Sequence, residues 1–357
     1  MDGFFERVAA AADATGDRAA TLDDPCQYPS AEIDALHGAG VLAAVVPVAE
    51  GGCGFGTAPD GADGAFRMLR SIGRGNLSVG RLIEAHVNAL KLITLYGSAG
   101  QTARASADAR AGHCFALWVT ETAAPVRLID GRLCWSKQFC SGAGYTTRAL
   151  VTACQPDGGT VLAIVTLDPG TRPAADPIRL QGMREAVTGT MDLTGLTADI
   201  VGAPGDYLRQ PEFSAGAWRT SAVTLGGLDA LVAAVRAGLV ARGRAADPHQ
   251  LVRLGELFAA QETCALWVQR AARIAEQGSG DPGAVAAYVN LARVTVERTV
   301  LAALQTAQRA LGLGAFIVGS PAERLLRDLA TYLRQPAPDE TLTEAAAFYT
   351  RAGGMPE

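Results

Sequence analysis

The chain has few residues of the kinds that build metal centres, disulfide frameworks or nucleic-acid surfaces. Its four histidines and seven cysteines are scattered, without a CxxC pair, so we expect no zinc site and reduced, structurally packed cysteines. Lysine and arginine number 31 against 36 acidic residues, and the net charge of −5 gives no basic field for a nucleic-acid backbone. We expect no nucleic-acid partner.

Targeting and membrane-spanning segments are not evident in the sequence either. The first twenty residues carry acids among apolar side chains and lack a basic flank followed by an uninterrupted apolar stretch, unlike a signal peptide. By inspection no apolar run reaches membrane-spanning length, so we expect no membrane span. These features predict a cytoplasmic protein.

Length and composition favour a large, ordered protein. A chain of 357 residues exceeds what one small core usually serves, so two or three packed units are expected. Hydrophobic residues make up 49% and charged residues 19%, which disfavours disorder and suits a helix-rich protein with dry interfaces. Association with further copies is therefore plausible.

Residues 1–111 have a helical pattern. Its clearest helix is predicted between Ser78, a candidate N-cap, and Gly97, a candidate C-cap, with an apolar stripe at helical spacing between them. His86 lies on that stripe. Because nothing near it in sequence offers a catalytic partner, we favour a hydrogen-bonded core histidine over a catalytic one.

Residues 112–203 have a different pattern, with short β-prone runs separated by turn residues such as Asp130-Gly131. This predicts a compact middle β domain. The Gly- and Pro-containing stretch 202–206 then predicts a linker.

Residues 204–357 return to long amphipathic segments, around 218–243, from about 250 to 277, and from 282 to about 311. Asp281 followed by Pro282 suits the start of the third of these, with aspartate as N-cap and proline at the first helical position. Helices of this length predict a C-terminal four-helix bundle with an oligomer interface on one side.

Five short strings, in order along the chain, together resemble the acyl-CoA dehydrogenase family. Residues 36–54 resemble its "GLLG…VP…GGxG" segment, and 118–121 (WVTE) resemble the start of "TEPxAGSD". Residues 137–142 (KQFCSG) resemble "KxWITN", 181–184 (QGMR) resemble "GMR", and 319–328 (GSPAERLLRD) resemble the helix that precedes the family's catalytic segment. The resemblance implies an α+β fold with a helical front, a β-rich middle and a helical rear.

The resemblance also implies FAD bound in the cleft between the β domain and the C-terminal helices. Thr120 would offer its hydroxyl to the pyrimidine edge of the flavin, with backbone groups of Leu117 and Val119 on either side of it. Phe139, where the family usually has tryptophan, would pack against the ring, and Ser141 would hydrogen-bond the N5 side. The alternative for Phe139 and Ser141 is ordinary alternation along a half-buried strand.

The family's usual catalytic base is not found at its expected position. A Glu shortly after "RDxxxY" removes the substrate α-proton in the family, whereas an ungapped match places Pro336 there, which can hold no proton. Glu340, or Asp339 beside it, could substitute, although acids at a turn before a helix more often cap or face solvent. The alternative base position, around Arg219, has no carboxylate.

The phosphate-binding motifs of the family are also incomplete. After Glu121 the "GSD" element is absent, and the "QxxGGxG" string has its best counterpart in residues 309–314. Arg309 could pair with a phosphate, and backbone amides near Gly312 could approach one. Another family arginine has its nearest counterpart in Arg253, which is displaced.

Three functions are compatible with this pattern. The first is an FAD-dependent oxidoreductase that dehydrogenates an acyl thioester with a non-standard or missing base and passes electrons to an acceptor. The second is a flavin-dependent monooxygenase that uses oxygen and needs no such base, and the third is a catalytically silent binding subunit. The resemblance implies a homodimer or homotetramer, in which a neighbouring subunit completes the flavin site.

Overall fold

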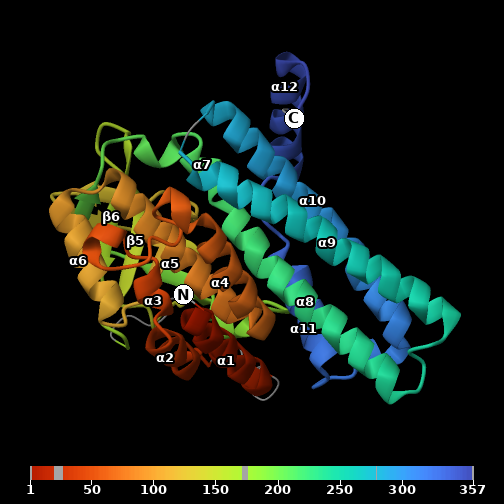
Figure 1. Ribbon diagram of the computed structural model, residues 1–357. Helices are drawn as coiled ribbons and strands as arrows, with labels where there is room; N and C mark the ends of the chain where they lie inside the picture. Colours follow the sequence, from red (N-terminus) through yellow and green to blue (C-terminus); the bar gives the residue numbers. More distant parts are fainter. Residues whose placement is uncertain (1, 20–26, 171–175, 279, 356–357) are drawn as a thin grey trace.

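The computed structural model describes residues 2–19, 27–170, 176–278 and 280–355. The first part of the chain is helical and lies beside the long helices of the rear part (Figure 1). Its helices and short 3-10 turns are α1 (Asp2–Ala19), α2 (Ser30–Gly38), α3 (Val41–Ala44), η1 (Val48–Glu50), η2 (Pro59–Gly61), α4 (Ala62–Gly75), α5 (Leu77–Tyr96) and α6 (Ala99–Arg110).

Helix α5 is buried along most of its length and begins with an asparagine cap. The side-chain oxygen of Asn76 accepts hydrogen bonds from the amides of Ser78 and Val79 at 2.8 and 3.2 Å. The prediction of Ser78 as N-cap is therefore wrong by two residues, because asparagine caps a helix as well as serine does and already supplies the acceptor. The predicted C-cap at Gly97 is confirmed.

The middle part of the chain forms two sheets. One has the order β3-β2-β5-β6-β9, with β1 pairing β5, and the other has the order β4-β8-β7. Their strands are β1 (Phe115–Trp118), β2 (Arg127–Ile129), β3 (Arg132–Cys134), β4 (Ser136–Cys140), β5 (Arg148–Cys154), β6 (Thr160–Thr166), β7 (Asp176–Pro177), β8 (Gly189–Asp192) and β9 (Asp199–Val201), with turn η3 (Arg184–Ala186) before β8.

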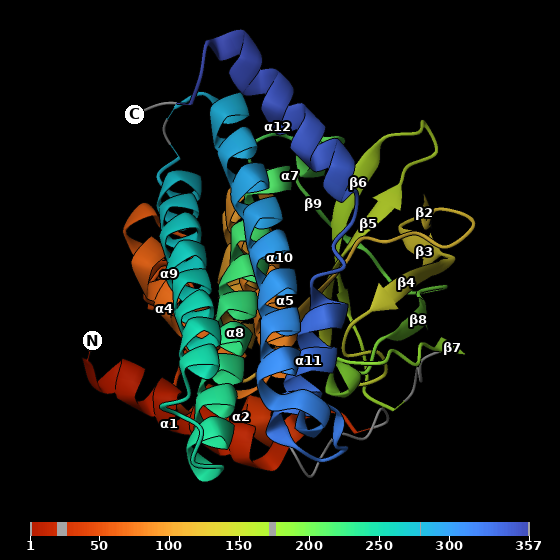
Figure 2. The same cartoon turned by 90° about the vertical axis from the view of Figure 1, so that its right-hand side faces the viewer.

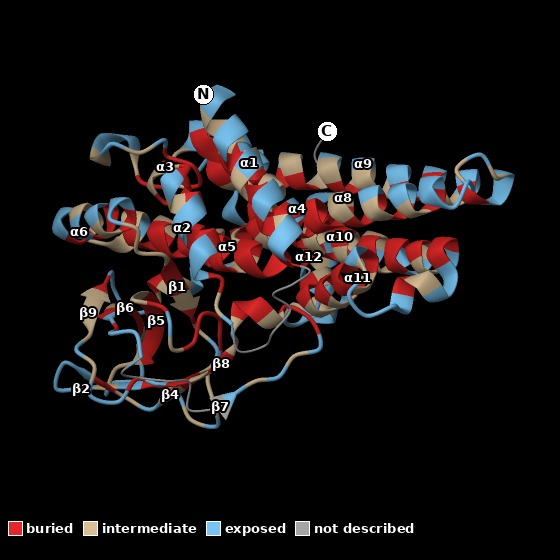
Figure 3. Cartoon of the chain, turned by 90° about the horizontal axis from the view of Figure 1, so that it is seen from below, coloured by how far each residue is buried: buried red, intermediate tan, exposed pale blue. Residues whose placement is uncertain are grey.

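Alternation along β5 lets this strand serve two cores. Val151 packs with the apolar residues of the middle part, whereas its neighbour Leu150 packs with the core of the helices. Successive side chains of a strand point to opposite faces, so the larger sheet is covered on both sides. Figure 3 shows the result, with buried residues concentrated on the inner faces of helices and strands.

The rear part is a bundle of long helices. Its elements are η4 (Asp206–Leu208), α7 (Glu212–Ala215), α8 (Ala217–Ala241), α9 (Pro248–Glu276), α10 (Pro282–Leu311), η5 (Gly312–Phe316), α11 (Pro321–Tyr332) and α12 (Pro338–Ala352). In Figure 2, α8, α9 and α10 run alongside one another, and α12 lies across the upper end of α10. The predicted start of α10 is confirmed, since the Asp281 side chain accepts a hydrogen bond of 2.9 Å from the Gly283 amide.

Helix α8 packs closely against α4 because glycines remove the side chains between them. A Cβ atom at Gly73 would come within 2.2 Å of the Val223 carbonyl oxygen, and one at Gly226 within 2.1 Å of the Arg70 carbonyl oxygen. Residues of the front and rear helices consequently belong to one continuous apolar core. Close backbone approach of this kind requires glycine.

The expectation that no segment has membrane-spanning character needs correction. Residues 212–241, which include α8, are long and apolar enough to cross a membrane by length and composition. Within the part of the chain that the structure describes this is the single such helix, and 56% of its most apolar window is buried. Its packing against α4, α9, α10 and α11 is that of a core helix.

The strand-rich middle is attached to α11 through the Gln181–Met183 segment. The amide of Met183 donates to Asp328 Oδ1 at 2.6 Å, and the amide of Gly182 donates to Thr331 Oγ1 at 3.1 Å. Asp328 also faces Arg324 at 3.4 Å. These bonds set the position of the β domain relative to the bundle.

Candidate flavin site

The predicted site begins at the open side of β1. The amide of Phe115 donates to Nδ1 of His86 at 3.0 Å, so the polar backbone groups of this residue face away from the paired strand β5. Because these groups alternate sides along a strand, those of Leu117 face the same open side. This orientation agrees with the predicted role of Leu117 beside a flavin edge.

Val119 and Thr120 extend this edge beyond β1. The carbonyl of Thr120 accepts from the Gln138 amide at 3.0 Å, and the carbonyl of Val119 lies 3.5 Å from the Thr152 hydroxyl. The exposed Thr120 side chain has no hydrogen bond within the described residues, so its hydroxyl is available to a ligand. The carbonyls of Val119 and Thr120, unlike the Thr120 hydroxyl, already have hydrogen-bond donors beside them.

Phe139 leaves the β4–β8 ladder and presents its ring to the surface. The register of the pair shifts between Lys137 and Cys140, and Phe139 has a φ angle of 54°. A positive φ is costly for a bulky residue, and bulges of this kind redirect a side chain. The ring is 50% exposed, which makes it a flat apolar surface for an aromatic ligand. Simple alternation along β4 does not explain this geometry.

Ser141, at the end of β4, is held by helix α5. Its hydroxyl oxygen accepts a hydrogen bond of 3.3 Å from Nε of Arg81. A hydroxyl that accepts a bond keeps its own proton for donation. Ser141 can therefore still donate to a ring nitrogen, as the prediction requires.

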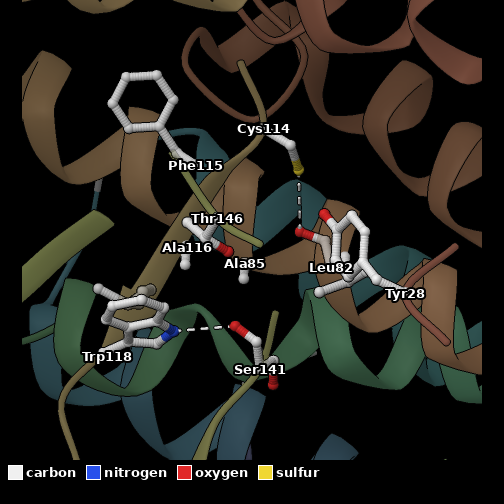
Figure 4. A pocket seen from close by; sticks show the side chains of 10 residues that line it. Tyr28, Leu82, Ala85, Cys114, Phe115, Ala116, Trp118, Ser141 and Thr146 are labelled. Atoms are coloured by element: carbon white, nitrogen blue, oxygen red, sulfur yellow. Dashed lines mark hydrogen bonds between the residues drawn. The ribbon is translucent and has the colours of Figure 1, made fainter. Parts of the chain in front are cut away.

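The space directly behind Ser141 is almost filled. Trp118 Nε1 donates to the Ser141 carbonyl at 3.0 Å, and Figure 4 shows both residues at one end of a small cavity whose other end is formed by Cys114 and Tyr28. Its volume of about 10 Å³ is close to the room needed by one water molecule. A flavin ring would therefore have to lie on the open side, over Phe139 and Thr120.

Glu121 and Lys137, from the second and third resembling strings, hold the two strings together. The Lys137 ammonium is fully buried and pairs with the Glu121 carboxylate, and it donates to the Thr152 hydroxyl at 2.6 Å. Burial lowers the pKa of Lys137, while Glu121 opposes that shift. Glu121 also accepts from the Val126 amide at 3.1 Å. That amide is consequently not available to a phosphate.

Sequence reasoning missed a row of polar side chains on α5. Arg81, Glu84, Asn88 and Lys91 follow helical spacing and share one face of an otherwise apolar helix. Glu84 accepts from Arg81 Nη1 at 2.6 Å, from the Asn88 amide, and from the Thr220 hydroxyl at 3.2 Å. The spacing of these residues in the sequence was the available signal.

Arg219 continues this row on α8, and its role is structural. Its guanidinium pairs with the buried Glu276 carboxylate and donates to the Asn88 side chain at 2.6 Å. Glu276 also pairs with Lys91 at 2.9 Å. Arg219 is thus part of a buried ion pair.

Tyr332, the tyrosine of "RDxxxY", is also buried, near Arg81 and Glu84 of the polar row. Its hydroxyl makes no hydrogen bond of ordinary geometry among the described residues, although the Thr220 hydroxyl lies beside it. Burial, followed by the negative charge of Glu84, holds the pKa of Tyr332 well above its usual value. The phenol therefore stays neutral and keeps a proton to donate.

Among the described residues, neither predicted base position makes a hydrogen bond to this polar row. Pro336 is exposed, and its carbonyl accepts a hydrogen bond from Arg293. Glu340 is exposed in the first turn of α12, where an acid stabilises the helix dipole. Its assignment as a base stays a prediction.

The predicted phosphate contacts lie at the end of α10. Arg309 is exposed in its last turn, and Gly312 follows as an exposed C-cap with a φ angle of 60°. Beyond them four exposed apolar side chains project from the surface: Leu313, Phe316, Ile317 and Val318. Arg253 lies on α9, a different helix from Arg309.

His86 is the core histidine that the sequence favoured. Its Nδ1 accepts from the Phe115 amide, so Nε2 carries the proton and donates to the Leu42 carbonyl at 3.2 Å. Burial lowers its pKa to about 4. Among the described residues no group of three or more His, Cys, Asp or Glu side chains could hold a metal ion.

Comparison with known proteins supports the fold strongly and the sequence relationship weakly. No protein-family model and no curated protein matches the chain. Solved structures do match, among them the dibenzothiophene monooxygenase TdsC from Paenibacillus sp. A11-2, at 19% identity and a TM-score of 0.80, over 98% of this chain and 97% of that one. TdsC has also been solved with FMN bound.

Two further structures match over almost their whole length. Butyryl-CoA dehydrogenase from Megasphaera elsdenii has 16% identity and a TM-score of 0.82, over 98% of both chains. Methanesulfinate monooxygenase MsuC from Pseudomonas fluorescens has 20% identity and a TM-score of 0.80, over 99% of this chain and 98% of that one. The chain has the acyl-CoA dehydrogenase fold.

The predicted α+β architecture is therefore confirmed. Dehydrogenase and monooxygenase structures match this acyl-CoA dehydrogenase fold with almost the same TM-score, so overall shape does not distinguish the two reactions. That distinction has to come from the residues of the candidate site.

Proposed function

We propose that the protein is a flavin-dependent monooxygenase on the acyl-CoA dehydrogenase fold. One observation carries the proposal: an ungapped match places Pro336 at the position of the family's base, and Glu84, the carboxylate paired with the arginine that binds Ser141, already accepts three hydrogen bonds. A carboxylate so engaged has little capacity to take a substrate proton. Oxygen transfer needs no α-proton removal.

The residues of the cleft fit a flavin ring. The open backbone edge at Leu117 and the free Thr120 hydroxyl suit its polar pyrimidine edge, and the exposed Phe139 ring suits its apolar face. Ser141 keeps a proton to donate to a ring nitrogen. When bound and reduced, a flavin supplies two electrons with which dioxygen gives one atom to the substrate and the other to water.

The protein's own residues would orient the ring and the substrate. Arg81 fixes the Ser141 oxygen, so the hydroxyl proton points away from the guanidinium. Tyr332 remains a neutral donor because burial raises its pKa. The filled space behind Ser141 keeps bulk water from that side.

For the form of the flavin we retain FAD, held at its phosphates by a second copy of the chain. Arg309 and Gly312 are exposed, and the apolar side chains of Leu313 and Val318 lie next to them in the chain. If a second subunit packs on these apolar side chains, Arg309 and Gly312 of the first subunit reach the flavin phosphates bound in the second. FMN has one phosphate and needs no such neighbour. In the loop after Glu121, the Val126 amide is already bonded and is not available to a phosphate.

The proposal is tested by titrating the purified full chain with FAD and FMN and recording the visible spectrum. With saturated protein and an external flavin reductase, a monooxygenase transfers 18O from 18O2 into an organic product. Bleaching by acyl-CoA thioesters without oxygen would instead establish dehydrogenation, with Glu340→Gln as the diagnostic variant. No binding of either flavin would overturn the redox assignment and leave a silent binding subunit.

A matched pair of variants locates the flavin. Phe139→Ala removes the exposed ring, and the expected loss is about 2- to 12-fold in flavin affinity, because an aromatic pair contributes about 0.5–1.5 kcal/mol beyond area burial. Trp135→Ala removes another exposed aromatic side chain of the same domain and should leave affinity unchanged. If both variants weakened flavin binding equally, the flavin ring would not lie on Phe139.

A further inference from the structure

The polar row on α5 contains more positive than negative charge. Arg81, Lys91 and Arg219 are its cations, and Glu84 and Glu276 are the carboxylates that face them. Three cations thus share two carboxylates, which leaves one positive charge in excess within the interface of α5, α8 and α9. A partly buried excess of charge is expensive unless an anion compensates it.

The two inner cations of this row are paired within the protein, although Nε of Arg219 has no hydrogen-bond partner among the described residues. Arg219 is buried and bonded to Glu276, Asn88 and the Gly56 carbonyl, and Lys91 pairs with the same carboxylate. Trp218 Nε1 adds a further donor to Glu276 at 3.1 Å. These contacts hold α5, α8 and α9 together.

Arg81, at the outer end of the row, is different. Its side chain is 29% exposed, and its guanidinium uses Nε for Ser141 and Nη1 for Glu84, while Nη2 has no hydrogen-bond partner among the described residues. Glu84 fixes the plane of the guanidinium. A planar fork held by a carboxylate on one side is well suited to bind an oxyanion on the other.

A second polar group near Arg81 also has no partner. The Tyr332 hydroxyl is buried, senses both Arg81 and Glu84, and makes no hydrogen bond of ordinary geometry among the described residues. A buried hydroxyl without a hydrogen-bond partner lowers the stability of the fold unless a ligand forms a hydrogen bond with it. Arg81 and Tyr332 thus offer two donors, from α5 and α11, beside Ser141, whose own proton is assigned to the flavin ring.

We propose that Arg81 is the specificity-determining residue for an oxyanion group on the substrate, a carboxylate, sulfinate, sulfonate or phosphate, with Glu84 as its positioning residue. This inference rests on the proposed function for the identity of the site, since it places the anion beside the flavin. The binding step itself does not require flavin. The substrate class is then a small organic acid, and a neutral acyl chain is disfavoured.

The test compares charged and uncharged probes of the same shape on the full-length protein, with and without flavin, at constant ionic strength. Benzoate is paired with benzamide, methanesulfonate with dimethyl sulfone, and phosphate with trimethyl phosphate, and binding is measured by isothermal titration calorimetry. We expect at least one acid to bind and its uncharged partner to bind about 10- to 100-fold more weakly, the factor that a charge-assisted hydrogen bond contributes.

Three variants test the residue. Arg81→Met together with Glu84→Gln removes the guanidinium without leaving a buried carboxylate, and Arg81→Lys keeps the charge without the fork. We expect the double variant to lose acid binding and Arg81→Lys to retain part of it, while the exposed Arg104→Met binds as the native protein does. Circular dichroism confirms that each variant is folded.

Two results would overturn the inference. One is a folded double variant that binds the acids as tightly as the native protein, and the other is a native protein that binds none of the acids more tightly than its uncharged partner. Failure of the proposed function is a separate result, because acid binding by flavin-free protein would persist if the chain bound no flavin.

Discussion

The Asp328 carboxylate on α11 accepts a hydrogen bond of 2.6 Å from the backbone amide of Met183, joining the β domain to the rear helices. Asp328→Ala would leave that amide and Arg324 without their buried acceptor, so we expect a loss of about 3 kcal/mol in the free energy of unfolding. Urea denaturation measures it. Asp339→Ala, at an exposed acid, is the control and should change stability by under about 0.5 kcal/mol. Similar losses in both variants would contradict the role given to Asp328.

His86 should make the protein sensitive to acid. Its pKa is lowered to about 4 in the fold, whereas the unfolded value is near 6.5, so the unfolded state takes up the proton first. The contribution of His86 to stability is complete above pH 6.5 and falls as pH decreases towards 4, by about 3 kcal/mol. His86→Gln should flatten this part of the stability curve, and His249→Gln, at an exposed histidine, should not. An unchanged slope in His86→Gln would refute the prediction.

Glu185 should have the opposite effect to His86 on how stability depends on pH. The Glu185 carboxyl is buried and accepts a hydrogen bond of 2.7 Å from Asn76. Burial raises its pKa to about 7 from the ordinary value of 4.5. The folded state therefore holds the proton longer, and stability is lost as pH rises from about 4.5 to 7. Glu185→Gln keeps the acceptor for Asn76, so we expect it to be about 3 kcal/mol more stable than the native protein at pH 8 and equal to it at pH 4. A variant that is less stable at pH 8 would show that the ionised carboxylate is well solvated.

The apolar end of α10 should mediate self-association. Leu313 and Val318 are 83% and 87% exposed, and charged substitutions there would place an unpaired charge in an interface between subunits. Leu313→Asp with Val318→Asp is expected to lower the molar mass measured by light scattering and to weaken FAD binding more than FMN binding. Val240→Asp, at an exposed valine on α8, serves as the matched control. An unchanged mass in the double variant would place the interface elsewhere.

Much of the fold was predictable because its signals are local. Asp281 and Pro282 start α10 where expected, and the long helical spans agree with the predicted ones to within a few residues, since caps and apolar spacing act over one or two turns. Ser78 was chosen as a cap over Asn76 because both suit that position, and only the backbone path shows which one is used.

The candidate site was less predictable because its contacts join distant parts of the chain. Arg81 meets a serine 60 positions later, and Glu84 meets a threonine 136 positions later, and no local pattern encodes either pairing. The polar spacing on α5 could have indicated a buried row, but its apolar stripe was the stronger signal. Phe139 was singled out by resemblance alone, since strand alternation gives no sign of a bulge.

The backbone contact of Gly73 with Val223 also affects the order in which the protein can fold during synthesis. Helix α4 leaves the ribosome long before α8, so its inner face has no cover until the second half of the chain has been made. The front helices cannot reach their final packing as an independent early unit. Nascent chains that stop before α8 would therefore present a large apolar surface to chaperones and proteases.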